Sequence, residues 1–111
     1  MTEVTVNSRE ISGGSHVTVY KMFGNQYYFA IVETIGVYPK AGFWAENRNR
    51  SIYNLVLEGE VTFVINGVEH KLAKDQGIMT EDGDRFQILG KGRIMVFVND
   101  GPGGATEDVA E

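Results

Sequence analysis

Short apolar runs dominate the chain. They are rich in Val, Ile, Thr, Tyr and Phe, and glycine, asparagine or aspartate separates them, which is typical of β-strands. No stretch of ten or more residues keeps a helical period, so the sequence predicts no helix of any length. The expected strands are Glu3–Val6, His16–Phe23, Tyr27–Ile35, Phe43–Glu46, Ile52–Leu57, Val61–Ile65, Val68–Leu72, Gly77–Thr80, Arg85–Leu89 and Arg93–Val98.

Turn signals connect several of these runs. Asn66-Gly67 stands between Val61–Ile65 and Val68–Leu72 and is a strong hairpin signal, and Gly24-Asn25 is expected to turn the second run into the third. Many short strands joined by tight turns in one small chain predict an all-β sandwich or a barrel-like jelly roll.

The alternation within the strands predicts which side chains are buried. Val61, Phe63 and Ile65 are expected to face the core, because alternate residues of a strand share a face. The run Ile52–Leu57 carries apolar groups on both faces, as expected where one face meets the core and the other meets a partner. Exposed apolar area on the outer faces favours a homodimer.

The end of the sequence differs from the rest. From Gly101 onward it is glycine-rich and acidic and has no apolar periodicity. We expect residues 1–100 to form a single domain and residues 101–111 to form a flexible acidic tail.

Composition excludes several classes of function. The 111 residues suit one domain, and 42% hydrophobic with 23% charged residues is ordinary for a globular protein. The absence of cysteine rules out disulfides and thiolate catalysis and fits a reducing cytoplasm. No apolar run suits a signal sequence or a bilayer span, so a soluble cytoplasmic protein without membrane contact is expected. A net charge of −5 disfavours nucleic-acid binding.

From about Ile31 to Val98 the sequence resembles the cupin superfamily. The resemblance is carried by Val56-Leu57-Glu58-Gly59-Glu60 and the apolar hairpin after it. It implies a cupin-like double-stranded β-helix, a jelly-roll barrel, in which two motifs place histidine and glutamate metal ligands inside the barrel.

The ligand positions of that family hold other residues here. Aligning Gly59 with the glycine of the first motif places Glu46, Arg48 and Ile52 at its three ligand positions. Aligning Lys74-Asp75 with the Gly-Asp pair that often opens the second motif places Arg85 at the fourth. Arginine has no lone pair to offer, isoleucine has no donor atom, and one carboxylate is not a metal site. The sequence therefore predicts no metal and no cofactor.

The same positions suggest a different kind of site. If Arg48 and Arg85 point into the pocket, their planar donors suit a small anionic or polyhydroxylated ligand, with Glu46 orienting one of them. Asn49 and Arg50 belong to the same polar run and are expected to face water. A shift of the strand register by one residue would reverse the facing of every side chain in this run. Further contacts are expected from an aromatic wall of Trp44 or Tyr53 and from hydrogen bonds of Asn54, Thr80 and Gln87.

Three functions stay open at this point. The leading hypothesis is a metal-independent protein that binds a small molecule, either a sugar or an anionic metabolite. The second is a metal-free sugar isomerase or epimerase with Glu46 as base and an arginine stabilising the enolate, although a carboxylate between two arginines is a poor base. The third is a structural or interaction domain whose pocket is plugged by ion pairs among Glu46, Arg48 and Arg85.

Overall fold

The computed structural model describes residues 4–10, 15–22 and 27–111, and its described residues form strands and turns without a helix. The all-β fold expected from the sequence is therefore confirmed. The strands are β1 (Val4–Glu10), β2 (His16–Met22), β3 (Tyr27–Tyr38), β4 (Phe43–Ile65), β5 (Val68–Ala73), β6 (Gly77–Thr80) and β7 (Arg85–Ala110). The expected turn at Gly24-Asn25 lies outside the described residues. No helix that could cross a membrane is found among the residues described.

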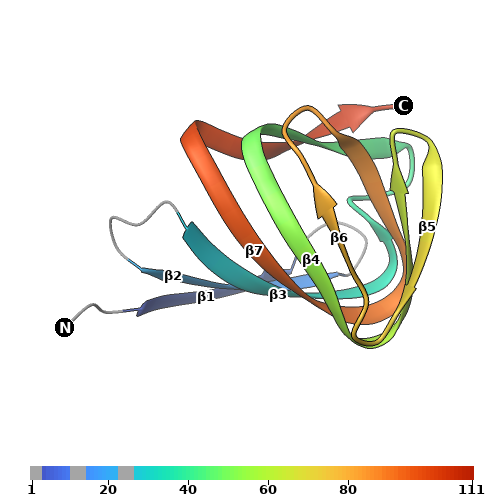
Figure 1. The fold of residues 1–111 in the computed structure, drawn as a ribbon, viewed down its shortest axis with the longest axis horizontal. Helices are drawn as coiled ribbons and strands as arrows, with labels where there is room; N and C mark the ends of the chain where they lie inside the picture. The colour runs from blue at the N-terminus through green and yellow to red at the C-terminus, as the bar shows by residue number, and fades with distance from the viewer. Residues whose placement is uncertain (1–3, 11–14, 23–26) are drawn as a thin grey trace.

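All strands pair antiparallel in one sheet that curls into a barrel. The order is β1-β2-β3-β7-β4-β5, and β6 pairs with β4. Figure 1 shows that the long ribbons of β4 and β7 curve around the barrel, whereas β1 and β2 continue the sheet to one side of it, at the left of the view.

The two longest strands each unite several of the expected short ones. The runs Phe43–Glu46, Ile52–Leu57 and Val61–Ile65 all belong to β4, because the chain bends between them without leaving the ladder. One bend lies at Gly59, where φ is +82° and a side chain would collide with the carbonyl oxygen of Lys91 on β7. A glycine at this position lets the two backbones approach closely.

Residues 101–110 also belong to a strand. They form the last part of β7 and pair with the start of β4, from Phe43 opposite Ala110 to Arg48 opposite Ala105. The expectation of a flexible tail after residue 100 is therefore corrected. Backbone hydrogen bonds to β4 order this segment, although its sequence offers few apolar side chains for burial.

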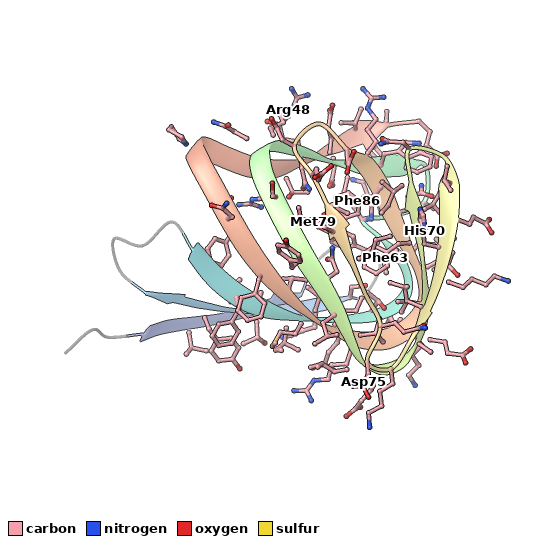
Figure 2. All side chains as sticks on the ribbon, viewed as in Figure 1. Arg48, Phe63, His70, Asp75, Met79 and Phe86 are labelled. Carbon is pink, nitrogen blue, oxygen red and sulfur yellow. The ribbon has the colours of Figure 1, made fainter. Side chains whose placement is uncertain are left out.

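The core fills the inside of the barrel. Phe63 and Ile94 are fully buried, and Figure 2 shows Phe63 and Phe86 between the ribbons of the barrel. The inward face predicted for Val61, Phe63 and Ile65 is confirmed, since the first two are buried and Ile65 packs against the core. The buried apolar cluster consists of Val17, Ala30, Val32, Ala45, Ile52, Val56, Val61, Phe63, Phe86, Ile88, Ile94, Val96 and Val98.

The hairpin predicted at Asn66-Gly67 is confirmed. It joins β4 to β5, and both residues have positive φ values, of 49° and 84°. This conformation matches the twist of an antiparallel pair, and it is the reason why the Asn-Gly pair is such a clear signal.

Candidate functional site

A bulge in β4 decides which polar side chains face the barrel interior. Before it, Ala45 and Asn47 are fully buried; after it, Ile52 and Asn54 are buried. The buried positions thus change from odd to even numbers across Asn49, which has a φ of 55° and lies at a register shift between β4 and β7. An extra residue in one strand reverses the facing of everything beyond it.

Because of the bulge, the side chain of Arg50 points into a pocket inside the barrel. The cavity measures about 160 Å³ and lies between β2, β3, β4 and β7. Most of its wall is apolar or aromatic, and Arg50, Asn54 and Thr106 add polar groups. Its lining consists of Val17, Val19, Tyr28, Ala30, Val32, Tyr38, Arg50, Ile52, Asn54, Phe86, Ile88, Val96, Val98 and Thr106.

Arg50 is held in place by a bidentate carboxylate and two hydroxyl groups. Its Nε donates to Oδ1 of Asp100 at 2.6 Å and its Nη2 to Oδ2 of Asp100 at 3.1 Å. Nη1 donates to Oγ1 of Thr106 at 3.0 Å, and Nη2 also donates to the hydroxyl oxygen of Tyr28 at 2.9 Å. Both charged side chains are only 16% exposed. This geometry fixes the guanidinium plane in the pocket wall.

The guanidinium of Arg50 remains charged. Burial by itself lowers its pKa, but the hydrogen bond to Asp100 and the proximity of Tyr28, Asp100 and Tyr38 together outweigh burial and leave the pKa raised. Arg50 therefore acts as a permanent hydrogen-bond donor and not as a base. Because Asp100 supplies one negative charge, the pair as a whole is neutral.

The C-terminal part of β7 completes this end of the pocket. Thr106 Oγ1 donates to Oδ1 of the buried Asn47 at 3.0 Å, and Asn49 Nδ2 donates to the carbonyl oxygen of Pro102 at 2.6 Å. A side chain at Gly104 would come within 2.7 Å of the carbonyl oxygen of Asn49. The glycine-rich composition of this segment therefore serves close backbone approach to the bulge.

The structure does not bring Arg48 and Arg85 into the pocket. Arg48 Nη2 lies 3.0 Å from Oε2 of Glu46, and its Nε lies 2.6 Å from Oε2 of Glu107. Arg85 Nε is 3.7 Å from Oε1 of Glu46. Both arginine side chains are more than half exposed, and Figure 2 shows Arg48 at one end of the barrel, opposite the end that carries Asp75.

These ion pairs form on the outside because Glu46 and Arg48 precede the bulge. They alternate with the buried Ala45 and Asn47 and so face outward. The predicted cluster of Glu46 with two arginines does exist, but it neither lines nor plugs the cavity. The expectation that Arg50 faces water is corrected for the same reason, since it lies beyond the bulge.

The other expected contact residues also spread over different places. Asn54 lines the pocket and donates to the carbonyl oxygen of Ile78 at 3.1 Å. Tyr53 is 63% exposed on the outer face. Half-buried Trp44 pairs with Val109 in the ladder. These two aromatic residues are not part of the lining.

Gln87 and Thr80 are likewise outside the lining. Gln87 Nε2 donates to the carbonyl oxygen of Phe43 at 2.8 Å and to Oε1 of Glu111 at 2.7 Å. Thr80 is fully buried, and the carbonyl oxygen of Thr80 accepts from Asn47 Nδ2 at 3.4 Å. The Gln87 side chain therefore supports the ends of strands, Thr80 contributes its backbone carbonyl to Asn47, and neither side chain lines the cavity.

A substitution at Thr80 is expected to stabilise the protein. Its Oγ1 is buried and has no hydrogen-bond partner in the structure, and an unsatisfied hydroxyl costs about 1–3 kcal/mol. Thr80→Val keeps the shape and removes the hydroxyl, so the free energy of unfolding should rise by about 1 kcal/mol in urea denaturation. A fall of that size would show that the hydroxyl has a partner, such as a buried water.

The described residues do not offer a metal centre. No three His, Asp or Glu side chains gather within the described part of the chain. At the ligand positions that the cupin resemblance implies, Ile52 has no donor atom and the arginines have no lone pair. In the pocket, both oxygens of Asp100 already accept from Arg50. The donor set thus does not fit a transition-metal ion.

Comparison with known proteins identifies the fold. No protein-family model and no curated protein matches the sequence. Among solved structures, Pac13, a nucleoside dehydratase, is 15% identical with a TM-score of 0.81 over 97% of this chain and 90% of that chain. A Streptomyces Pac13 variant with uridine gives the same identity and TM-score over 97% and 89%.

Two further similar structures are cupin proteins. The Cnp3 cupin domain of Schizosaccharomyces pombe is 13% identical, with a TM-score of 0.69 over 88% of this chain and 71% of that one. A sugar phosphate isomerase of the cupin superfamily from Silicibacter pomeroyi is 13% identical, with a TM-score of 0.67 over 96% and 78%. The chain therefore has the cupin fold, and the fold class predicted from the sequence is confirmed.

Sequence reasoning missed the polar group that the pocket contains. Arg50, Asp100, Tyr28 and Thr106 come from β3, β4 and β7 and meet only in the folded barrel. One local signal was available. Asn49 is an asparagine in a polar strand, and asparagine tolerates the left-handed conformation of a bulge better than most residues.

Proposed function

We propose that this cupin-fold protein binds a small uncharged molecule with several hydrogen-bonding groups, one ring of which enters the barrel pocket. A nucleoside or a free sugar has this chemistry. The observation that carries the proposal is the neutral Arg50–Asp100 pair in the wall of an otherwise apolar and aromatic cavity.

The size of the cavity supports a single ring. Its volume is about 160 Å³, and an engineered protein cavity of about 150 Å³ binds benzene. One five- or six-membered ring therefore fits inside, and a second ring or a longer substituent has to remain at the mouth. This size favours a compact metabolite over a large cofactor.

The lining suits a ring that has both an apolar face and polar edges. The walls combine aliphatic side chains with Tyr28, Tyr38 and Phe86, and Arg50 and Asn54 add directional polar groups. A largely apolar pocket with a few convergent polar groups is the usual form of a small-molecule site. Nucleobases and sugars bind to such walls through their faces and to the polar groups through their edges.

The proposed ligand is neutral, whereas the ligand considered for Arg48 and Arg85 in the sequence analysis is anionic. Asp100 already binds both Nε and Nη2 of Arg50. An anionic ligand at Arg50 would therefore have to displace the Asp100 carboxylate or lie close to its negative charge. A neutral ligand meets no such repulsion. Glu46 lies outside the cavity lining, so the structure offers no support for an isomerase that uses Glu46 as its base.

The comparisons favour the same class of ligand. The Pac13 structures concern a nucleoside dehydratase, one of them with uridine, and another structure of this fold is a sugar phosphate isomerase. These activities are those of the matched proteins, which are 15% or less identical to this chain. They make nucleosides and sugars the first ligands to test.

Uridine is expected to stabilise the protein, and uridine 5′-monophosphate much less so. A ligand that binds only the folded state raises the melting temperature with its concentration, which thermal-shift measurements with uridine, ribose and the monophosphate record. Isothermal titration then gives the dissociation constants. No shift with any neutral nucleoside or sugar, together with a clear shift by anions, would overturn the proposal.

A cavity-filling variant provides the matched test of the location. Ala30 is buried in the lining, and Ala30→Val adds two carbon atoms to the cavity. We expect this variant to weaken ligand binding at least about tenfold, which is the effect of losing about 1.4 kcal/mol. Val68→Ala, at an exposed site of β5, serves as control. Equal affinity in both variants would place the ligand elsewhere.

A further inference from the structure

A continuous row of large apolar side chains crosses the outer face of the sheet. The ladder pairs Val6 with Tyr20, Tyr20 with Phe29, Phe29 with Phe97, Phe97 with Tyr53, and Tyr53 with Met79. The apolar row therefore runs through β1, β2, β3, β7, β4 and β6 without interruption and consists of Val6, Tyr20, Phe29, Phe97, Tyr53 and Met79.

Three rings of the apolar row pack against one another on the outer face. The ring centroids of Tyr20 and Phe29 are 4.8 Å apart in a stacked arrangement, and those of Phe29 and Phe97 are 6.1 Å apart. Val6 is 58% exposed, Phe97 50% and Tyr53 63%. Isolated apolar residues on a surface are ordinary, whereas an uninterrupted row of this length indicates a contact surface.

We propose that the apolar row is the centre of an interface between two copies of this chain. A second copy is the occupant that the surface fits best, because in a two-fold dimer the same patch must meet itself. Two flat sheet faces pack well on each other when their side chains are large and apolar.

The area of the patch suits such a dimer. An aromatic side chain has about 150–250 Å² of surface, so each half-exposed ring offers roughly 100 Å². Three such rings, with Val6, Met79 and the partly buried next row of Ile31, Leu55 and Met95, offer roughly 500 Å². A stable interface buries about 800 Å² on each partner, with an apolar centre and a polar rim.

The polar border of the patch is compatible with its own copy. Along one side the ladder places exposed Arg93 between exposed Glu33 and Glu58. A border with charges of both signs allows Arg93 of each copy to approach a carboxylate of the other. A border of one sign would repel a second copy and select an oppositely charged partner instead.

This surface is the reverse side of the pocket wall. Phe29 lies between Tyr28 and Ala30, and Phe97 lies between Val96 and Val98, whose side chains all line the cavity. Because neighbours in a strand face opposite sides, a second copy on the apolar row leaves the cavity uncovered. The dimer is thus independent of the proposed ligand.

Light scattering after gel filtration tests the proposal. The wild-type protein is expected at twice the chain mass of 12.3 kDa. Phe97→Lys and Tyr53→Lys each place a charge in the apolar row and should each give a monomer. Val68→Lys places the same charge on β5, at a side chain that is 58% exposed and pairs with Ile65, at the end of β4 and away from the part that pairs with β6 and carries Tyr53, and should remain a dimer.

Several outcomes would contradict the proposed dimer. A monomeric wild type at tens of micromolar, a larger oligomer, or a dimer that persists in both row variants would overturn the proposal. A dimer lost only in Val68→Lys would place the interface elsewhere and overturn it as well. Circular dichroism confirms folding, and Tyr53→Lys decides if Phe97→Lys fails to fold.

Discussion

Asp100→Asn is expected to lower the free energy of unfolding by about 3 kcal/mol, because it leaves the largely buried cation of Arg50 without its counter-charge. Asparagine keeps the shape and one acceptor oxygen but loses the bidentate charged contact, whose two distances are 2.6 and 3.1 Å. Urea denaturation of the wild type and the variant measures the difference. The variant pocket should also gain affinity for phosphate or uridine 5′-monophosphate, since its wall then carries a net positive charge.

Two further variants separate charge from packing. Glu107→Gln removes one of the two carboxylates paired with Arg48. Both side chains of that pair are more than half exposed, so the loss should stay below about 1 kcal/mol. The double variant Arg50→Met with Asp100→Leu removes both buried charges and should recover much of the stability lost in Asp100→Asn. Equal losses in Asp100→Asn and Glu107→Gln would contradict the central role of the Arg50–Asp100 pair.

Deleting residues 101–111 is expected to destabilise the barrel by at least about 4 kcal/mol, as each lost hydrogen bond is worth about 1 kcal/mol. The deletion removes the ladder partners of Phe43–Arg48 and takes Thr106 from both Arg50 and the fully buried Asn47. Chemical denaturation measures the loss. Hydrogen exchange of the intact protein should show slow amides between residues 105 and 110.

The matched control removes Glu111 alone. Glu111 is exposed, and its deletion costs one side-chain hydrogen bond from Gln87 and one backbone hydrogen bond to the carbonyl oxygen of Gly42. The loss should be about 1–2 kcal/mol. If the long deletion were as stable as this control, residues 101–110 would not be a structural strand.

The strands could be predicted from the sequence because apolar alternation and turn residues are local signals. Asn66-Gly67 fixed a hairpin, and Val61 and Phe63 revealed the inner face of their strand. The direction of the pocket side chains could not be predicted in the same way. Glu46, Asn47, Arg48, Asn49 and Arg50 are all polar, so no apolar alternation sets their facing, and a one-residue bulge reverses it.

The last part of β7, residues 101–110, could not be predicted for a different reason. Its order comes from backbone pairing with Phe43–Arg48 and from polar contacts of Thr106, and neither depends on an apolar pattern. The glycine-rich composition suggested a flexible segment, but in the structure the absence of a side chain at Gly104 allows its backbone to approach Asn49 closely. Composition alone does not distinguish these two uses of glycine.

The pairing of Phe43 with Ala110 also has a consequence during protein synthesis. The barrel cannot close until residue 110 has left the ribosome, because the first residues of β4 pair with residues that are made long after them. Translation at about 5–20 residues per second leaves the apolar segments of β3 and β4 without their partner β7 for several seconds. Nascent chains stalled before residue 110 should therefore recruit chaperones that recognise unpaired apolar strands.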